Sequence, residues 1–274
     1  MTAQALIIAG YGLNCEEETL HAFEYNGAAG NIIHINDLID NIKILDQYQI
    51  LAIPGGFSYG DDTGSGNAFA QKMKLALGDA LINFIERDTL TIGICNGCQI
   101  LANLGLVPAL DERYGERNVA VTYNSSNRYQ CRWIDIKTED NNSPWLYGID
   151  RMHIPVAHGE GRFIMPEHTL EQMQNDGHIA ARYIKTDGTY AQEEFPYNPN
   201  GSMGDIAAMQ DRSGRVLAIM PHPERGMFSW QRDDFDYLKD QAIRKGEKLT
   251  EVSDGMALFE NAARYFECAK AKTA

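Results

Sequence analysis

The sequence predicts an α/β fold: a mostly parallel sheet with helices on both faces, joined by partly antiparallel strands in the second half of the chain. In the first hundred residues, short apolar runs alternate with segments of helical periodicity, as in a parallel sheet. Later, two apolar runs flank Asp211-Arg212-Ser213-Gly214, a turn sequence that joins antiparallel strands. We find no internal repeat, and we expect residues 1–274 to form a single domain.

The first half of the chain predicts four strands separated by helices. Glu16–Asn26 has helical spacing and stops before Gly27, and apolar residues recur at three- and four-residue steps from Phe69 to Phe84. A short helix follows the fourth strand and closes at Gly105. The strands are expected at Ala5–Ala9, Ile32–Ile35, Ile50–Ile53 and Thr91–Ile94.

Three loops leave the carboxyl ends of these expected strands, at residues 10–14, 54–61 and 95–97. In open parallel sheets the ligand binds beyond the carboxyl ends of the strands. We therefore expect the three loops to meet and to form the functional site.

The second half predicts antiparallel strands and surface helices. Cys131–Lys137 alternates in polarity, and Ile206–Gln210 and Arg215–Met220 flank the hairpin turn. The polar stretch Phe228–Leu249 is expected to be a surface helix or an excursion from the domain. Ser253 is expected to cap a last helix. The apolar face of that helix carries Leu258, Phe259, Ala262 and Phe266.

Composition and charge exclude several function classes. The 274 residues are 44% hydrophobic and 23% charged, which is typical of a globular protein. A formal net charge of −14 repels phosphate backbones, so we expect no nucleic-acid partner. The apolar runs are far too short to span a membrane, and Met1–Ala9 lacks the basic start of a secretory signal. We expect a cytoplasmic protein that does not contact membranes.

The cysteines are consistent with free thiols in a reducing cytoplasm. There are five of them, an odd number at irregular spacing. Cys95 and Cys98 spell C-x-x-C, but a redox or zinc site of that type needs a second ligand pair, and none has the spacing. We expect no metal and no cofactor on this chain. The five are Cys15, Cys95, Cys98, Cys131 and Cys268.

The sharpest chemical signal is Gly93-Ile94-Cys95-Asn96-Gly97, which has a strand before it and a helix after it. This G-x-C-x-G pattern matches a nucleophile elbow with cysteine in place of serine. Glycines stand two residues before and after Cys95 because the tight turn brings them against neighbouring backbone. The helix N-terminus favours the thiolate form of Cys95. An isolated match would equally fit a buried structural cysteine.

A histidine and a carboxylate follow a later strand, in Met220-Pro221-His222-Pro223-Glu224. A thiol nucleophile needs a base to take its proton and an acid to protonate the leaving amine, and one histidine can do both. Glu224 could orient the imidazole of His222. Taken alone, this segment is better interpreted as a surface turn.

The glycine turn Pro54–Asp61 could supply backbone donors to a developing oxyanion. The amides of Gly56 and Asn96 would make a two-donor oxyanion hole, although the turn by itself fits a flexible loop. Together with Cys95, His222 and Glu224, these groups predict acyl transfer from an amide or ester through a thioester. The spacing does not identify the substrate.

The same residues resemble the class I, triad-type glutamine amidotransferases, and among them the glutaminase subunits of phosphoribosylformylglycinamidine synthase. The elbow and the His-x-Glu pair are common to the whole class, whereas the strings GGFSYGD, CNGCQ, AHGEGR and NPNGS are more specific to these subunits. The matching stretches are Asn14–Glu16, Pro54–Asp61, Gly93–Leu101, Pro155–Phe163, Asn198–Ser202 and Met220–Arg225.

The resemblance implies that residues 1–274 form one glutamine amidotransferase domain with a polar excursion near residues 228–249. It implies that Cys95 attacks the side-chain amide of L-glutamine, that His222 moves the proton, and that Glu224 orients His222. The oxyanion would lie against Gly56 and Asn96. Ammonia would pass to a large synthetase subunit that holds ATP and magnesium and makes the amidine of formylglycinamide ribonucleotide. A small bridging subunit accompanies many bacterial relatives.

Two segments depart from the family pattern. Asp61–Phe69 contains no basic residue where bacterial relatives usually carry one, and Phe228–Leu249 is longer than expected. We expect the first to affect docking or glutamine contact and the second to alter the partner interface. His158, in the AHGEGR string, is expected to be a structural residue bonded to backbone rather than a docking or gating residue.

Two alternatives remain open at this point. One is a glutaminase that serves another synthetase, or a γ-glutamyl hydrolase. The other is a non-catalytic, redox-sensing or regulatory protein on the same fold that uses Cys95 as its sensor; such a protein does not require His222 and Glu224.

Overall fold

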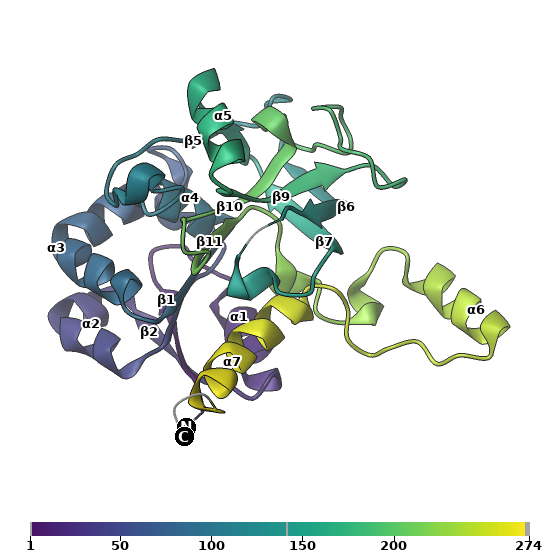
Figure 1. Cartoon of the computed structure of the whole chain (residues 1–274), viewed down its shortest axis with the longest axis horizontal. Helices are drawn as coiled ribbons and strands as arrows, with labels where there is room; N and C mark the ends of the chain where they lie inside the picture. Colours follow the sequence, from purple (N-terminus) through teal and green to yellow (C-terminus); the bar gives the residue numbers. More distant parts are fainter. Residues whose placement is uncertain (1, 141, 272–274) are drawn as a thin grey trace.

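The computed structural model describes residues 2–140 and 142–271, with side chains up to Glu267 (Figure 1). Cys268, one of the expected free thiols, lies outside the described side chains; Cys15, Cys95, Cys98 and Cys131 are free. Within the described residues, we find no helix with the length and apolar character of a membrane span.

A sheet of nine strands organises the chain, in the order β2-β1-β3-β4-β11-β10-β9-β6-β7. The strands from β2 to β11 pair in parallel, and those from β11 to β7 pair antiparallel. This confirms the predicted mostly parallel sheet with an antiparallel second half. The strands are β1 (Gln4–Ala9), β2 (Ala29–His34), β3 (Ile50–Ile53), β4 (Leu90–Ile94), β6 (Gln130–Thr138), β7 (Arg151–His158), β9 (Ile179–Ile184), β10 (Ile206–Gln210) and β11 (Val216–Ile219).

Helices cover both faces of the parallel half: α1 and α7 lie on one side, and α3 and α4 on the other (Figure 1). A separate antiparallel pair is formed by β5 (Ala120–Thr122) and β8 (Arg162–Ile164), and β5 contacts α4. The helices are α1 (Glu16–Tyr25), α2 (Ile35–Asp40), α3 (Asn67–Glu86), α4 (Asn96–Leu104), α5 (Glu167–Asn175), α6 (Phe235–Lys245) and α7 (Met256–Ala271).

The pattern of buried residues explains why the central strands and the helices beside them formed where they did. β3 and β4 are buried at every residue, as expected of strands covered on both faces. In α3 the apolar positions at three- and four-residue steps, from Phe69 to Phe84, face the core. The helix after β4 ends at Gly105, whose φ of 69° is the left-handed conformation that glycine adopts readily.

Two of the local predictions were wrong. Ile35 is not in the second strand but begins α2, because the side chain of His34 accepts a hydrogen bond from the Asn36 amide and caps a helix there. Ser253 does not cap the last helix, which begins at Met256. Its hydroxyl instead accepts a hydrogen bond from Arg232, at 3.5 Å.

The polar stretch Phe228–Leu249 contains α6, which projects from the rest of the molecule (Figure 1) and has no buried residue. His153 on β7 holds its base: Nδ1 lies 3.1 Å from Asp135 and Nε2 lies 2.9 Å from Asp233. Arg232 pairs with Asp234 at 2.7 Å. The assignment of residues 1–274 to a single domain stays a prediction.

We expect the attachment of α6 to weaken at high pH. Burial alone would lower the pKa of His153, but its bonds to Asp135 and Asp233 outweigh burial and raise that pKa. Because the folded-state pKa is the higher one, the stabilisation is complete below about pH 6.5 and is lost as pH rises through the folded-state pKa. The protection of residues 228–249 against hydrogen exchange, measured relative to the unfolded chain at the same pH, should fall over that range.

Asp233→Asn should weaken the attachment of α6 in the same way already at low pH. The free energy that opposes opening of this segment should fall by about 1 kcal/mol or less, because the His153–Asp233 pair is partly exposed. Asp236→Asn is the matched control, since Asp236 is exposed on α6 and makes no bond to His153. Equal exchange in the two variants would contradict this role for His153.

Candidate functional site

Cys95 lies in the turn between β4 and α4, with a φ of 50°, a strained backbone conformation for a residue with a side chain. The flanking glycines confirm the steric reason for the spacing. A Cβ on Gly93 would lie 2.6 Å from the Gly97 carbonyl carbon, and a Cβ on Gly97 would lie 1.9 Å from the Ile53 oxygen. Cys95 is 4% exposed, and its thiol donates to the Ala157 carbonyl at 3.8 Å.

His222 follows β11, the strand next to β4, so sheet order brings it beside the elbow. Its amide donates to the Pro155 carbonyl at 2.8 Å, and its Nδ1 lies 2.5 Å from Glu224 Oε1. Both side chains are buried, and within the described part of the chain His222 Nε2 has no hydrogen-bond partner. The free nitrogen is therefore on the opposite side of the ring from Glu224.

The charge state of His222 follows from its neighbours. Burial favours the neutral imidazole, but the Glu224 carboxylate and the Cys95 sulfur outweigh burial and raise the pKa of His222 well above its ordinary value. A cysteine beside an imidazolium that a carboxylate holds is the arrangement of an activated thiol nucleophile.

The two expected oxyanion donors lie on adjacent loops. The first loop packs backbone to backbone against Gly56: Phe57 N donates to Gly12 O at 2.8 Å, and a Cβ on Gly56 would lie 2.6 Å from Leu13 Cα. Gly56 has a φ of 151°. Asn96 is the first residue of α4, where amides have no partner within the helix. The structure thus brings the three predicted loops together, whereas the oxyanion role itself stays a prediction.

The side chain of Asn96 also ties the two loops together. Its Oδ1 accepts from the amide of Ser58 at 3.2 Å, and its Nδ2 donates to Gln99 at 2.7 Å. Asp61 lies near it, and burial, with the charge of Glu160, raises the pKa of Asp61 to about 6. Asp61–Phe69, the segment that lacks the basic residue usual in bacterial relatives, therefore begins with a carboxyl group next to the elbow.

His158 is buried, and its ring bonds a side chain rather than the expected backbone; its purely structural role stays a prediction. Nδ1 lies 3.2 Å from Asn124 Oδ1, which also accepts from the Gly161 amide. Burial, then the charge of His222, lowers the pKa of His158 to about 3. A Cβ on Gly161 would lie 2.6 Å from His158 Nδ1, so the AHGEGR string closes on this neutral ring.

Sequence reasoning missed the residues that hold this loop. Asn124 is buried and donates to the His158 carbonyl at 2.9 Å. In the NPNGS string, Asn200 donates to the Gly161 carbonyl at 2.8 Å, and Asn198 donates to Asp205 at 2.9 Å. The spacing of NPNGS alone signals only a turn, so its role as a clamp on a distant loop appears only in three dimensions.

Two clusters of described residues could offer ligands to a metal ion: Cys15 with His222 and Glu224, and His153 with Asp233 and Asp234. In the first, the Arg225 guanidinium already donates to the Cys15 sulfur at 2.9 Å. A cation would have to displace that guanidinium. Cys98, the second cysteine of C-x-x-C, is buried within α4 and belongs to neither cluster.

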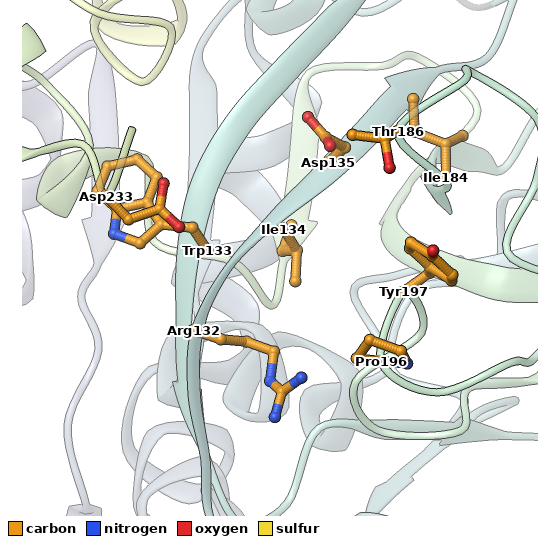
Figure 2. A pocket seen from close by; sticks show the side chains of 9 residues that line it. All are labelled: Arg132, Trp133, Ile134, Asp135, Ile184, Thr186, Pro196, Tyr197 and Asp233. Atoms are coloured by element: carbon orange, nitrogen blue, oxygen red, sulfur yellow. The ribbon is translucent and has the colours of Figure 1, made fainter. Parts of the chain in front are cut away.

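A cavity of about 410 Å³ lies away from the triad, along β6 (Figure 2). Arg132 and Asp135 of β6 line the cavity, as do Pro196 and Tyr197 of the loop after β9. Asp233, from the base of α6, lies beside Trp133. None of the predicted catalytic residues lines the cavity.

Comparison with known proteins gives concordant results. The family model described as a CobB/CobQ-like glutamine amidotransferase domain matches residues 2–266. The phosphoribosylformylglycinamidine synthase subunit PurQ of Methanococcus maripaludis strain C7 is 46% identical over 264 residues, covering 96% of this chain and 97% of that protein. The PurQ subunit of Dehalococcoides mccartyi is 36% identical over 96% of this chain and 97% of its own length.

A solved structure described as PurLQS from Thermotoga maritima contains a similar chain, with a TM-score of 0.68 and 29% sequence identity over 97% of this chain and 100% of that one. The strand order, the elbow and the buried His-x-Glu pair agree with the predicted amidotransferase fold. The chain therefore belongs to the PurQ family of phosphoribosylformylglycinamidine synthase subunits, within the CobB/CobQ-like glutamine amidotransferases.

Proposed function

We propose that this chain is the glutaminase subunit of a phosphoribosylformylglycinamidine synthase and that Cys95, His222 and Glu224 carry out the reaction. The observation that carries the site assignment is the buried His222–Glu224 pair on the strand next to the cysteine elbow. The identity of 46% with a PurQ subunit over nearly the whole chain supports the substrate and the pathway.

The geometry supports the following sequence of steps. The sulfur of Cys95 attacks the side-chain amide carbon of glutamine, and His222 gives the thiol proton to the leaving nitrogen, so that ammonia departs and a thioester remains. Water, deprotonated by His222, then cleaves the carbon–sulfur bond and releases glutamate. The amides of Gly56 and Asn96 stabilise the oxyanion in both steps.

The ammonia passes to a large synthetase subunit, as the assembly named PurLQS from Thermotoga maritima suggests. That partner holds ATP and magnesium and forms the amidine of formylglycinamide ribonucleotide. A small bridging subunit completes the complex. The exposed rings of Phe57 and Tyr129 have centroids 6.2 Å apart, and this aromatic surface is available to the partner.

A glutamine-directed diazo-ketone tests the nucleophile and the substrate class together. We expect a single adduct at Cys95, mapped by mass spectrometry and prevented by excess glutamine. The labelling should be run with the chain alone and with the synthetase present. Adducts at Cys15 or Cys131 but never at Cys95, under both conditions, would refute the glutaminase assignment.

Glu224→Gln should lower kcat about a hundredfold and shift the high-pH limb of the rate profile to lower pH. The carboxylate raises the pKa of His222, so its neutralisation lets the imidazolium lose its proton earlier. Rates of ammonia release measured from pH 5 to 10 would show the shift. An unchanged high-pH limb would mean that Glu224 does not set the charge of His222.

A further inference from the structure

The loop after β1 has no role in the proposed reaction, although its last residue is buried against the triad. Cys15 is 0% exposed and immediately precedes α1. Its amide donates to the Gly55 carbonyl at 3.3 Å, and the Asn14 amide donates to the same oxygen at 3.0 Å. The backbone of Cys15 is thus fixed to the residue that precedes the expected oxyanion donor Gly56.

The side chain of Cys15 faces the other half of the site. Arg225 Nη2 donates to the Cys15 sulfur at 2.9 Å. The sulfur and the ligand atoms of His222 and Glu224 all lie within 4.8 Å of one another. Cys15 is therefore bonded to the oxyanion loop through its backbone, and its sulfur lies within 4.8 Å of the base.

Gly55 shows how tightly these parts are packed. A Cβ on Gly55 would lie 2.7 Å from His222 Cε1 and 3.1 Å from the Cys15 sulfur. The glycine backbone, the thiol and the imidazole leave no room between them, so a displacement of Cys15 would move the loop, the imidazole or both.

The chemistry of Cys15 favours a holding role over a second nucleophile. Burial raises the pKa of its thiol, and the charge of Glu224 adds to the increase, although the nearby His222 opposes it. A buried, neutral sulfur is a poor nucleophile but a compact, polarisable acceptor for a guanidinium. Arg225 also reaches Glu18 of α1, at 3.9 Å, so it links the residue after Glu224 to the first helix.

We propose that Cys15 is a positioning residue: its sulfur, held by Arg225, and its amide, bonded to Gly55, fix the separation between the oxyanion donor Gly56 and the base His222. This inference rests on the proposed glutaminase function. Groups that act on one transition state must be held within a fraction of an ångström, and misplacement by about 1 Å can cost up to about a hundredfold in rate.

The test compares Cys15→Ala, Cys15→Ser and the control Cys131→Ala, which removes an exposed thiol, each assayed with the synthetase present. Cys15→Ala should lower kcat about tenfold or more and change KM by less than about twofold, because the lost geometry matters mainly in the transition state. Its high-pH limb should move to lower pH, since Cys15 supports the protonated form of His222. Cys15→Ser, which keeps an acceptor for Arg225, should recover most of the rate.

Equal rates and identical pH profiles in Cys15→Ala and wild type would overturn the inference. It would also be overturned if the alanine and serine variants lost activity equally and only in proportion to the fraction of each that fails to fold. If Cys15→Ala does not fold, Arg225→Gln keeps the cysteine, removes the guanidinium and should show the same loss of kcat. A wild-type complex that releases no ammonia would refute the proposed function instead. In that event the inference still predicts slower alkylation of Cys95 by iodoacetamide in Cys15→Ala, and an unchanged rate would overturn it.

Discussion

Cys95→Ala should abolish glutamine hydrolysis, with a loss in kcat of about 10⁴-fold or more, because no other group can form the thioester. The fold should be unaffected, since alanine keeps the Cβ and removes only a sulfur that makes one long bond to Ala157. Ammonia release measured with and without the synthetase gives the loss, and the melting temperature verifies folding.

Added ammonia separates the two halves of the proposed reaction. A complex that contains Cys95→Ala should still make the amidine when ammonium salts replace glutamine, because in the proposed reaction the amidine forms on the synthetase and not at Cys95. Glutamine-dependent synthesis that survives the substitution would instead favour the alternative in which Cys95 is a redox sensor. Cys98→Ala is a useful second control, because Cys98 is the other cysteine of C-x-x-C and is buried within α4.

Gly97→Ala should be the most destabilising small substitution near the site. The added Cβ would lie 1.9 Å from the backbone oxygen of Ile53, the buried last residue of β3, and backbone of a central strand cannot move aside as a flexible side chain can. We expect a loss of roughly 3 kcal/mol or more in the free energy of unfolding, at or above the usual range for overpacking. Chemical denaturation measures the loss, and glutaminase activity should fall with it as the elbow shifts.

Gly78→Ala provides the matched control. Gly78 lies inside α3, and a Cβ there would meet no atom within 4 Å. Alanine is the better helix former by roughly 0.5–1 kcal/mol, so this variant should be slightly more stable than wild type. If both glycine substitutions destabilised the chain equally, the close approach of Gly97 to Ile53 would not be the cause.

The sequence was sufficient for the features set by local patterns. The apolar runs located β1, β3 and β4 because strands covered on both faces are mostly apolar, and the glycine spacing identified the turn at Cys95 because only glycine fits there. Ile35 was misassigned because its apolar neighbours hid the cap that His34 provides. A cap depends on where one side chain points, and composition does not reveal that.

The features that could not be predicted depend on contacts between distant segments. The sequence presents Cys15 and Arg225 in separate motifs, 210 positions apart, and nothing in either motif indicates that a guanidinium meets a sulfur. The same is true of Asn200, which clamps the loop at Gly161. The roles assigned to Cys95, His222, Glu224, Gly56 and Asn96 remain predictions that the experiments above will decide.

The position of β11 in the sheet has a consequence for folding. This strand joins the parallel and antiparallel halves, pairing with β4 on one side and β10 on the other, and it directly precedes His222. During synthesis the elbow at Cys95 leaves the ribosome long before the strand that completes its neighbourhood. Pairing β11 with β4 closes a loop of more than a hundred residues, a high contact order that slows folding. Because the proposed base His222 follows β11, we expect a nascent fragment that ends before this strand to show no glutaminase activity.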